Sequence, residues 1–171
     1  MNINILTIFP EIFEILKFGV VSRSIKNKTL LINSFDIRAN SVNKHKHIDA
    51  KPYGGGEGMV MMAEPIIKTL KKIHKKQRGH VIYLSPQGKK LNQKKIISMS
   101  KLKNITLICG RYEGIDQRII DKYVDEEVSI GDFVLSGGEY AAICLIDAIS
   151  RHIPGTLGNK ESYLKDTFSN G

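Results

Sequence analysis

The order of apolar and polar residues alternates between two patterns along the chain. Short apolar or alternating runs predict β-strands, which occupy residues 2–8, 29–35, 80–84, 105–109 and 127–130. Stretches with apolar residues three and four positions apart predict helices, which occupy a short segment from Pro10 and residues 65–77, 92–101, 115–123 and 138–153. Because strands alternate with helices, the pattern predicts an α/β fold with a parallel sheet covered by helices on both faces.

Glycine-rich segments follow the last three predicted strands, at residues 85–88, 110–114 and 131–139. In a parallel sheet the carboxyl ends of the strands border the crevice where ligands bind. Glycine also lets backbone groups approach a ligand closely. Each segment alone is more typical of a tight turn, but their recurrence after three consecutive strands adds weight to a ligand site. Residues 38–58 have no periodicity and end in the glycine-rich run 51–58, which predicts a loop.

Well-known motifs of other enzyme classes are absent. No GxGxxG, GxxxxGK[ST], GxSxG or HExxH is found, which argues against a dinucleotide-binding Rossmann site, a P-loop, a hydrolase elbow and a zinc protease. The residues alone therefore indicate an α/β enzyme with a nucleotide-like ligand.

Composition indicates one globular domain without membrane segments. The 171 residues are 42% hydrophobic and include no Trp. No apolar run reaches 18 residues, and the first 20 residues lack a basic region, so neither a transmembrane helix nor a signal peptide is expected. Cys109 and Cys144 lie in apolar runs without a CxxC pattern, which predicts buried, reduced thiols and a cytoplasmic protein.

Positive charge is concentrated in one part of the chain. Lys and Arg number 26 against 17 Asp and Glu, a net charge of +9, and residues 65–103 hold 12 of the basic residues and no acidic one. Such a block indicates a polyanionic partner such as nucleic acid. Most of the basic residues are Lys in a chain rich in Ile and Asn, which is also typical of neutral surfaces encoded by an AT-rich genome.

Four long segments, in this order, resemble the TrmD family, the bacterial tRNA (guanine-N1)-methyltransferases of the SPOUT superfamily. They are Lys51–Met59, Tyr83–Gly88, Cys109–Asp116 and Ser129–Glu139, and Phe9–Glu11 and Ser150–Gly155 match as well. The chain departs from the family pattern at Glu57, where Pro is common, and at Phe133, where Tyr is common.

The resemblance implies a C-terminal trefoil knot, which periodicity does not predict because knots are nearly absent from proteins. It implies that residues 1–158 form the methyltransferase domain and that residues 159–171 begin a linker. The family's C-terminal helical tRNA-binding domain lies beyond that linker and is absent from this chain. The resemblance also implies a homodimer with tRNA as its partner.

The resemblance further implies that the knot binds S-adenosyl-L-methionine. Carried over by motif, the cofactor contacts fall on Tyr83, Leu84, Ser85, Pro86, Gly110, Tyr112, Glu113, Ile130, Gly131, Asp132, Phe133, Val134, Leu135, Gly137 and Gly138. Similar enzymes also use Mg²⁺, for which Glu113 is the nearby carboxylate. No dedicated metal-ligand set is expected.

The implied reaction is methylation of N1 of guanosine 37, immediately 3′ of the tRNA anticodon, which supports reading-frame maintenance. That nitrogen is protonated at neutral pH, so a general base must remove the proton while a cation stabilises charge on the guanine oxygen. The resemblance assigns these roles to Asp166 and Arg151.

Two alternatives remain open: a non-catalytic cofactor- or RNA-binding fragment, and another SPOUT enzyme acting on ribosomal RNA. The length of the chain favours the first, and we expect it to methylate tRNA weakly. The Tyr-Gly-Gly-Gly segment and the Arg111–Gly114 motif argue against the second.

Overall fold

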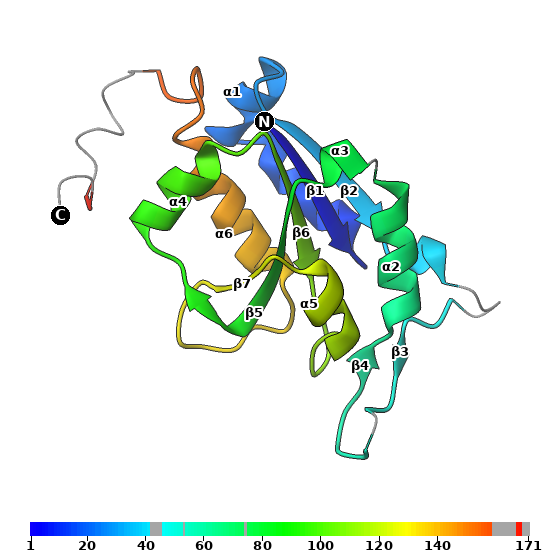
Figure 1. Ribbon diagram of the computed structural model, residues 1–171. Helices are drawn as coiled ribbons and strands as arrows, with labels where there is room; N and C mark the ends of the chain where they lie inside the picture. Colours follow the sequence, from blue (N-terminus) through cyan, green and yellow to red (C-terminus); the bar gives the residue numbers. More distant parts are fainter. Residues whose placement is uncertain (42–45, 53, 74, 159–166, 169–171) are drawn as a thin grey trace.

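The computed structural model describes residues 1–41, 46–52, 54–73, 75–158 and 167–168 (Figure 1). A sheet of five parallel strands forms its centre, in the order β2-β1-β6-β5-β7. The strands are β1 (Asn2–Thr7), β2 (Leu31–Asp36), β5 (His80–Lys90), β6 (Asn104–Cys109) and β7 (Glu126–Ser129). The predicted α/β fold with a parallel sheet is confirmed.

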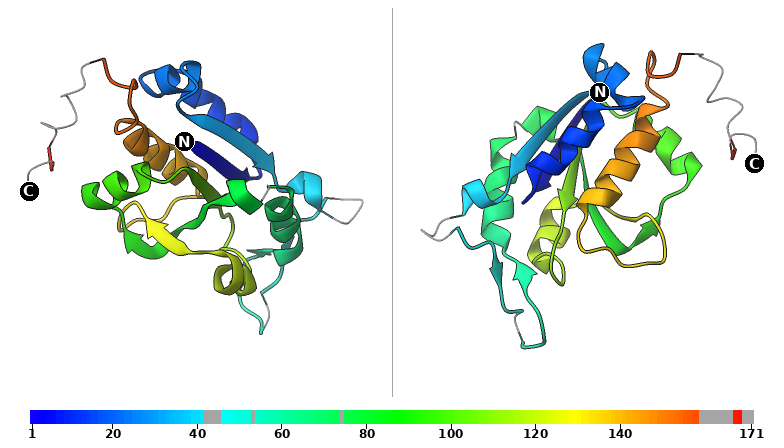
Figure 2. Two further views of the ribbon diagram at one scale, coloured as in Figure 1. Left: turned by 45° about the horizontal axis from the view of Figure 1, so that its top comes forward. Right: turned by 180° about the vertical axis from the view of Figure 1, so that it is seen from behind.

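Helices cover both faces of this sheet (Figures 1 and 2). On one face lie the 3₁₀ helix η1 (Pro10–Lys17) and the helices α1 (Val21–Lys26), α4 (Gln93–Ser100) and α6 (Glu139–Ser150). On the other face lie α2 (Ala63–Lys72), α3 (Lys75–Arg78) and α5 (Gln117–Tyr123). Successive residues of a strand face opposite sides. Ile105 and Leu107 of β6 therefore pack under α4 and α6, while Ile108 packs with α2 and α5.

Several elements differ from the sequence-based expectations. The predicted helix 65–77 is two helices, because the backbone is extended at Ile73. The short helix α1 was not predicted, since Ser22 and Ser24 share its buried side with Val21 and obscure the apolar period.

The predicted loop 38–58 also contains regular structure: the 3₁₀ turn η2 (Arg38–Asn40) and the strand β3 (Asp49–Ala50), which pairs with β4 (Val60–Met61) as an antiparallel hairpin. Strands of two residues are too short to show an alternating pattern.

The two cysteines differ in their surroundings. Cys109 ends β6 in the core, as expected, and burial together with the charge of Glu139 raises the pKa of its thiol well above the usual value. Cys144 is exposed, so the expectation that it is buried was wrong. It lies one turn after the half-exposed Tyr140 on the outward side of α6, a helix whose sequence is apolar nearly all round. Within the described part of the chain, no helix is both long and apolar enough to cross a membrane.

We expect Leu107→Ala to lower the free energy of unfolding by about 2–5 kcal/mol, because Leu107 is fully buried in the central strand and truncation leaves a cavity. The measurement is urea unfolding followed by far-UV circular dichroism. Leu31→Ala on the edge strand β2 is the matched control, since Leu31 is 51% exposed and its truncation should cost much less. Equal losses at the two positions would contradict this difference in burial.

Candidate functional site

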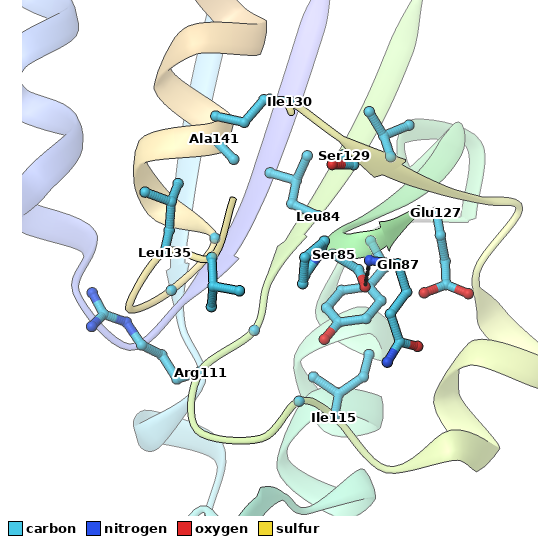
Figure 3. A pocket seen from close by; sticks show the side chains of 18 of the residues that line it. Leu84, Ser85, Gln87, Arg111, Ile115, Glu127, Ser129, Ile130, Leu135 and Ala141 are labelled. Carbon is cyan, nitrogen blue, oxygen red and sulfur yellow. Dashed lines mark hydrogen bonds between the residues drawn. The ribbon is translucent and has the colours of Figure 1, made fainter. Parts of the chain in front are cut away.

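A cavity of about 430 Å³ opens beside residues 83–87 within β5 and at the carboxyl ends of β6 and β7. Its walls come from the three glycine-rich segments and the first turn of α6 (Figure 3). Every residue expected to contact the cofactor lines it except Asp132: Tyr83, Leu84, Ser85, Pro86, Gly110, Tyr112, Glu113, Ile130, Gly131, Phe133, Val134, Leu135, Gly137 and Gly138. Asp132 lies in the same segment but forms an exposed ion pair with Lys90. The three glycine-rich segments predicted to border a crevice therefore share one site.

The first wall is an excursion within β5, which is longer than the predicted strand. Residues 82–84 pair with β7, and Lys89 and Lys90 pair with β7 again at Val128 and Ser129, so residues 85–88 bulge out of the ladder. The Ser85 hydroxyl accepts a hydrogen bond from the Gln87 backbone N–H at 3.2 Å (Figure 3). Gly88 lies against β7 so closely that a Cβ there would be 2.4 Å from the backbone nitrogen of Val128. Only glycine therefore fits at position 88, where the chain contacts the backbone of β7.

Close packing against glycines shapes the remaining walls as well. A Cβ on Gly110 would be 2.8 Å from the ring of Tyr83, and one on Gly137 would be 2.2 Å from Nε of Arg111. Gly138 donates its backbone N–H to the carbonyl oxygen of Gly110 at 2.9 Å. The segments after β6 and β7 therefore contact each other through their backbones, which leaves peptide groups at the cavity wall.

Tyr83 supplies a neutral hydroxyl at the floor of the cavity. Burial, with a smaller contribution from the charge of Glu127, raises the pKa of Tyr83 to about 12. The phenol is therefore protonated at neutral pH, and it can donate a hydrogen bond to a ligand.

A buried ion pair joins two of the walls. Arg111 donates from Nε to Oε2 of Glu139 at 3.0 Å, and the Glu139 side chain is fully buried. The second oxygen of Glu139 accepts from the hydroxyl of Thr7 at the end of β1, at 2.8 Å. The guanidinium of Arg111 also lies 4.7 Å above the ring of Phe9. This network fixes the start of α6 relative to β1 and to the segment after β6.

The glycine-rich segment 51–59 connects β3 to β4 and lies beside the segment after β6. The carbonyl oxygen of Met59 accepts from the backbone N–H of Glu113 at 3.0 Å, and the backbone N–H of Met61 donates to the carbonyl oxygen of Gly114 at 2.9 Å. A Cβ on Gly58, whose φ is +82°, would be 2.6 Å from Cγ of Glu113. The hairpin is therefore anchored to a wall of the cavity.

Of the two residues expected to be catalytic, Arg151 does not line this cavity. Arg151 caps the carboxyl end of α6, where it lines a smaller cavity of about 250 Å³ with Gln93, Ala148 and Thr167. The cavity between the glycine-rich segments lies at the amino end of the same helix. Asp166 falls outside the described residues.

Some residues of the site were missed by sequence reasoning. Glu139 was noted only as the end of a motif, and its role as buried partner of Arg111 depends on a contact across 28 residues. An acidic residue opening an otherwise apolar helix is the feature that could have drawn attention to it. Gln87, Ile115, Glu127 and Ser129 also line the cavity without having been expected there (Figure 3). Within the described ranges, no three His, Cys, Asp or Glu side chains cluster as metal ligands.

Comparison with known proteins agrees with this architecture. The family model described as tRNA (Guanine-1)-methyltransferase TrmD matches residues 1–171. The tRNA (guanine-N(1)-)-methyltransferase of Clostridium novyi (strain NT) is 49% identical over 171 residues, which is 100% of this chain and 70% of that protein. Its counterpart in Clostridium botulinum (strain Alaska E43 / Type E3) is 48% identical over 169 residues, covering 99% of this chain and 71% of that protein.

A solved structure shares the fold. The crystal structure of tRNA (m1G37) methyltransferase from Aquifex aeolicus superposes with a TM-score of 0.85 at 40% sequence identity, covering 93% of this chain and 72% of that one. With the match to the family model along its whole length, this chain belongs to the TrmD family of tRNA (guanine-1)-methyltransferases.

Proposed function

We propose that this protein transfers a methyl group from S-adenosyl-L-methionine to N1 of guanosine 37 in tRNA, in the cytoplasm. The observation that carries the proposal is the cavity formed by three glycine-rich segments in a chain of the TrmD family. The related Aquifex aeolicus enzyme is a tRNA (m1G37) methyltransferase, which supports position 37 as the target. The place of that base beside the anticodon links the reaction to reading-frame maintenance.

The cavity fits this cofactor chemically. Peptide groups at Gly110, Gly131 and Gly137 can bond the polar edge of an adenine. The apolar side chains of Leu84 and Leu135 can pack against the faces of the adenine ring (Figure 3). When bound, S-adenosyl-L-methionine supplies an activated methyl group. We further propose that the three segments form the trefoil knot of the family, with residues 1–158 as the catalytic domain and 159–171 as the start of a linker.

Residues of the chain itself remove the proton and stabilise the developing charge. N1 of guanine must lose its proton, and we propose the carboxylate of Asp166 as the base that takes it. Negative charge then develops on the guanine oxygen, where a fixed guanidinium lowers the barrier. We propose Arg151 for this role. For Mg²⁺ we propose the exposed carboxylate of Glu113, because Mg²⁺ keeps most of its waters and needs only one or two protein carboxylates.

The position of Arg151 supports a homodimer with shared sites. Twelve residues of α6 separate Glu139 at the cavity from Arg151, which is about 18 Å at 1.5 Å per residue. An arginine that far away does not reach a base held at its own cavity. The outward sides of α6 and the neighbouring η1 expose Tyr140 and Ile15, at 53% and 55%, as apolar surface for a second copy. We propose that Arg151 of one protomer completes the cavity of the other.

We expect S-adenosyl-L-methionine to bind the native protein, with ATP and NAD binding weakly or not at all. Gly137→Ala should weaken the cofactor at least about 10-fold, because the added methyl displaces Arg111 from the cavity wall. Isothermal titration calorimetry measures all of these affinities. Gly19→Ala is the control: its φ of +64° makes the backbone strained there, but its added methyl meets no atom within 4 Å and lies away from the cavity. An unchanged affinity in Gly137→Ala would contradict the assignment of the cofactor to this cavity.

We expect Asp166→Ala and Arg151→Ala each to slow single-turnover methylation of a tRNA transcript by about 10²–10⁴-fold. Arg151 does not line the cavity, and the role proposed for Asp166 is proton transfer rather than cofactor binding, so cofactor affinity should stay within about twofold of the native value in both variants. The conservative variant Arg151→Lys keeps the charge and should recover part of the rate. Full-speed methylation by Asp166→Ala would remove this residue from its role as base.

We expect mixed dimers to restore activity. A protomer carrying Arg151→Ala retains an intact cavity, and a protomer carrying Gly137→Ala retains an intact arginine, so one of the two shared sites in a mixed dimer is complete. Co-expression of the two impaired variants with different affinity tags, followed by tandem purification and a methylation assay at limiting cofactor concentration, measures this. Activity no higher than that of either parent would contradict the shared site.

A further inference from the structure

Three lysine-bearing segments far apart in sequence meet at the amino ends of the strands, the edge of the sheet opposite the cavity. Lys28 shortly precedes β2, Lys103 directly precedes β6, and Lys75 lies in α3 just before β5 (Figure 1). The register fixes these strand starts side by side, because Asn2 of β1 is opposite both Leu31 and Asn104.

Hydrogen bonds hold these segments at the edge. The terminal ammonium of Met1 donates to the carbonyl oxygen of Thr29 at 2.7 Å, and the backbone N–H of Asn2 donates to the carbonyl oxygen of Lys103 at 2.8 Å. The side-chain amides of Asn4 and Asn104 donate to the carbonyl oxygens of Gln77 and Lys76, at 2.9 and 3.1 Å. The positions of the lysine backbones are therefore set by the fold.

We call the exposed lysines gathered here the amino-edge patch, comprising Lys26, Lys28, Lys72, Lys75, Lys101 and Lys103. None of the six forms a salt bridge to a described residue, whereas Lys68 and Lys95 elsewhere in the basic block do. Residues 15–35 and 65–103, which supply the patch, contain no acidic residue. The acidic side chains at the end of this edge, Asp125 and Glu126, lie beside His80. The patch therefore carries concentrated positive charge.

The composition of the patch favours a phosphate backbone over other anionic partners. Lysine binds phosphate as a point charge, and such contacts carry no information about the base sequence. Binding to a membrane surface would need a continuous apolar face next to the charges, and the exposed apolar side chains at the starts of β2 and β6 are two single ones, Leu31 at 51% and Leu102 at 36%. A nucleic acid is the polyanion that needs no such face.

The distance from the cavity indicates which part of an RNA would reach the patch. The six-residue strands β1 and β6 span about 20 Å at 3.3 Å per residue, with the patch at one end and the cavity at the other. A base bound in the cavity and its immediate neighbours stay at the carboxyl edge. A duplex stem of the same RNA is long enough to extend past the other edge.

We infer that the amino-edge patch binds the phosphate backbone of the substrate tRNA outside its anticodon loop and adds affinity that is independent of sequence. This inference rests on the proposed function. It assigns to the fold a second contact with the substrate, distinct from the cavity where the methyl group is transferred.

The test compares two triple variants of equal charge. The patch variant is Lys72→Gln, Lys75→Gln and Lys103→Gln. The control variant is Lys17→Gln, Lys46→Gln and Lys68→Gln, none of which belongs to the patch and two of which, Lys17 and Lys68, pair with Glu14 and Glu64. We expect the patch variant to bind full-length tRNA about 10- to 50-fold more weakly at 0.15 M salt, with the slope of log K against log salt reduced by about two. The control variant should match the native protein in both measurements.

Two further readouts separate this inference from the proposed function. Methylation of a short anticodon stem-loop and calorimetric binding of S-adenosyl-L-methionine should be equal in all three proteins, because neither involves the patch. A native protein that methylates neither RNA would overturn the proposed function. The salt dependence of tRNA binding would still test whether the patch contacts phosphate. A patch variant with the native salt slope, or one that loses binding to phosphatidylserine vesicles but not to tRNA, would overturn the inference.

Discussion

The cavity depends on one buried ion pair, between Arg111 and Glu139. The carboxylate has no exposure to solvent, and its oxygens accept from Arg111 and from Thr7, so β1, the segment after β6 and the start of α6 meet at a single charge. Removing one member of such a pair typically costs about 3–5 kcal/mol, because the remaining charge is buried without compensation. The same pair keeps Arg111 against Gly137, where no side chain fits. The geometry of the walls is therefore coupled to the folding of the domain itself.

The parallel sheet divides the molecule into two chemically different ends. Loops at the carboxyl ends are glycine-rich and present peptide groups around a cavity, while segments at the amino ends present lysine ammonium groups. Glu139 and Arg151 lie at opposite ends of helix α6, so the helix begins at the cavity and holds Arg151 away from it. Under the proposed function, a site that needs both would take its arginine from a second protomer, and the proposed dimer would provide this without lengthening any loop.

Sequence reasoning worked where local pattern and burial agree. Residues 105–109 are apolar except for Thr106, because β6 is central and covered on both faces, and the strand was predicted to within one residue. It failed at α1 and the β3–β4 hairpin, which are too short or too polar for a period to appear. The crevice could be located from glycine-rich segments after consecutive strands, but the cofactor could not be identified from them and came from family resemblance. The Arg111–Glu139 pair was beyond reach, because nothing in either residue's neighbourhood specifies a partner 28 positions away.

The glycine lining of the cavity has a consequence for drug resistance. An inhibitor that competes for this cavity would be held largely by peptide groups, and no amino-acid substitution removes a backbone N–H except one to proline. Replacing Gly110 or Gly137 to obstruct such a compound would first drive a Cβ into Tyr83 or Arg111. Escape is then restricted to side chains at the rim, such as the exposed Phe133 and Val134. Compounds that contact the floor of the cavity and avoid its rim should therefore meet resistance more slowly.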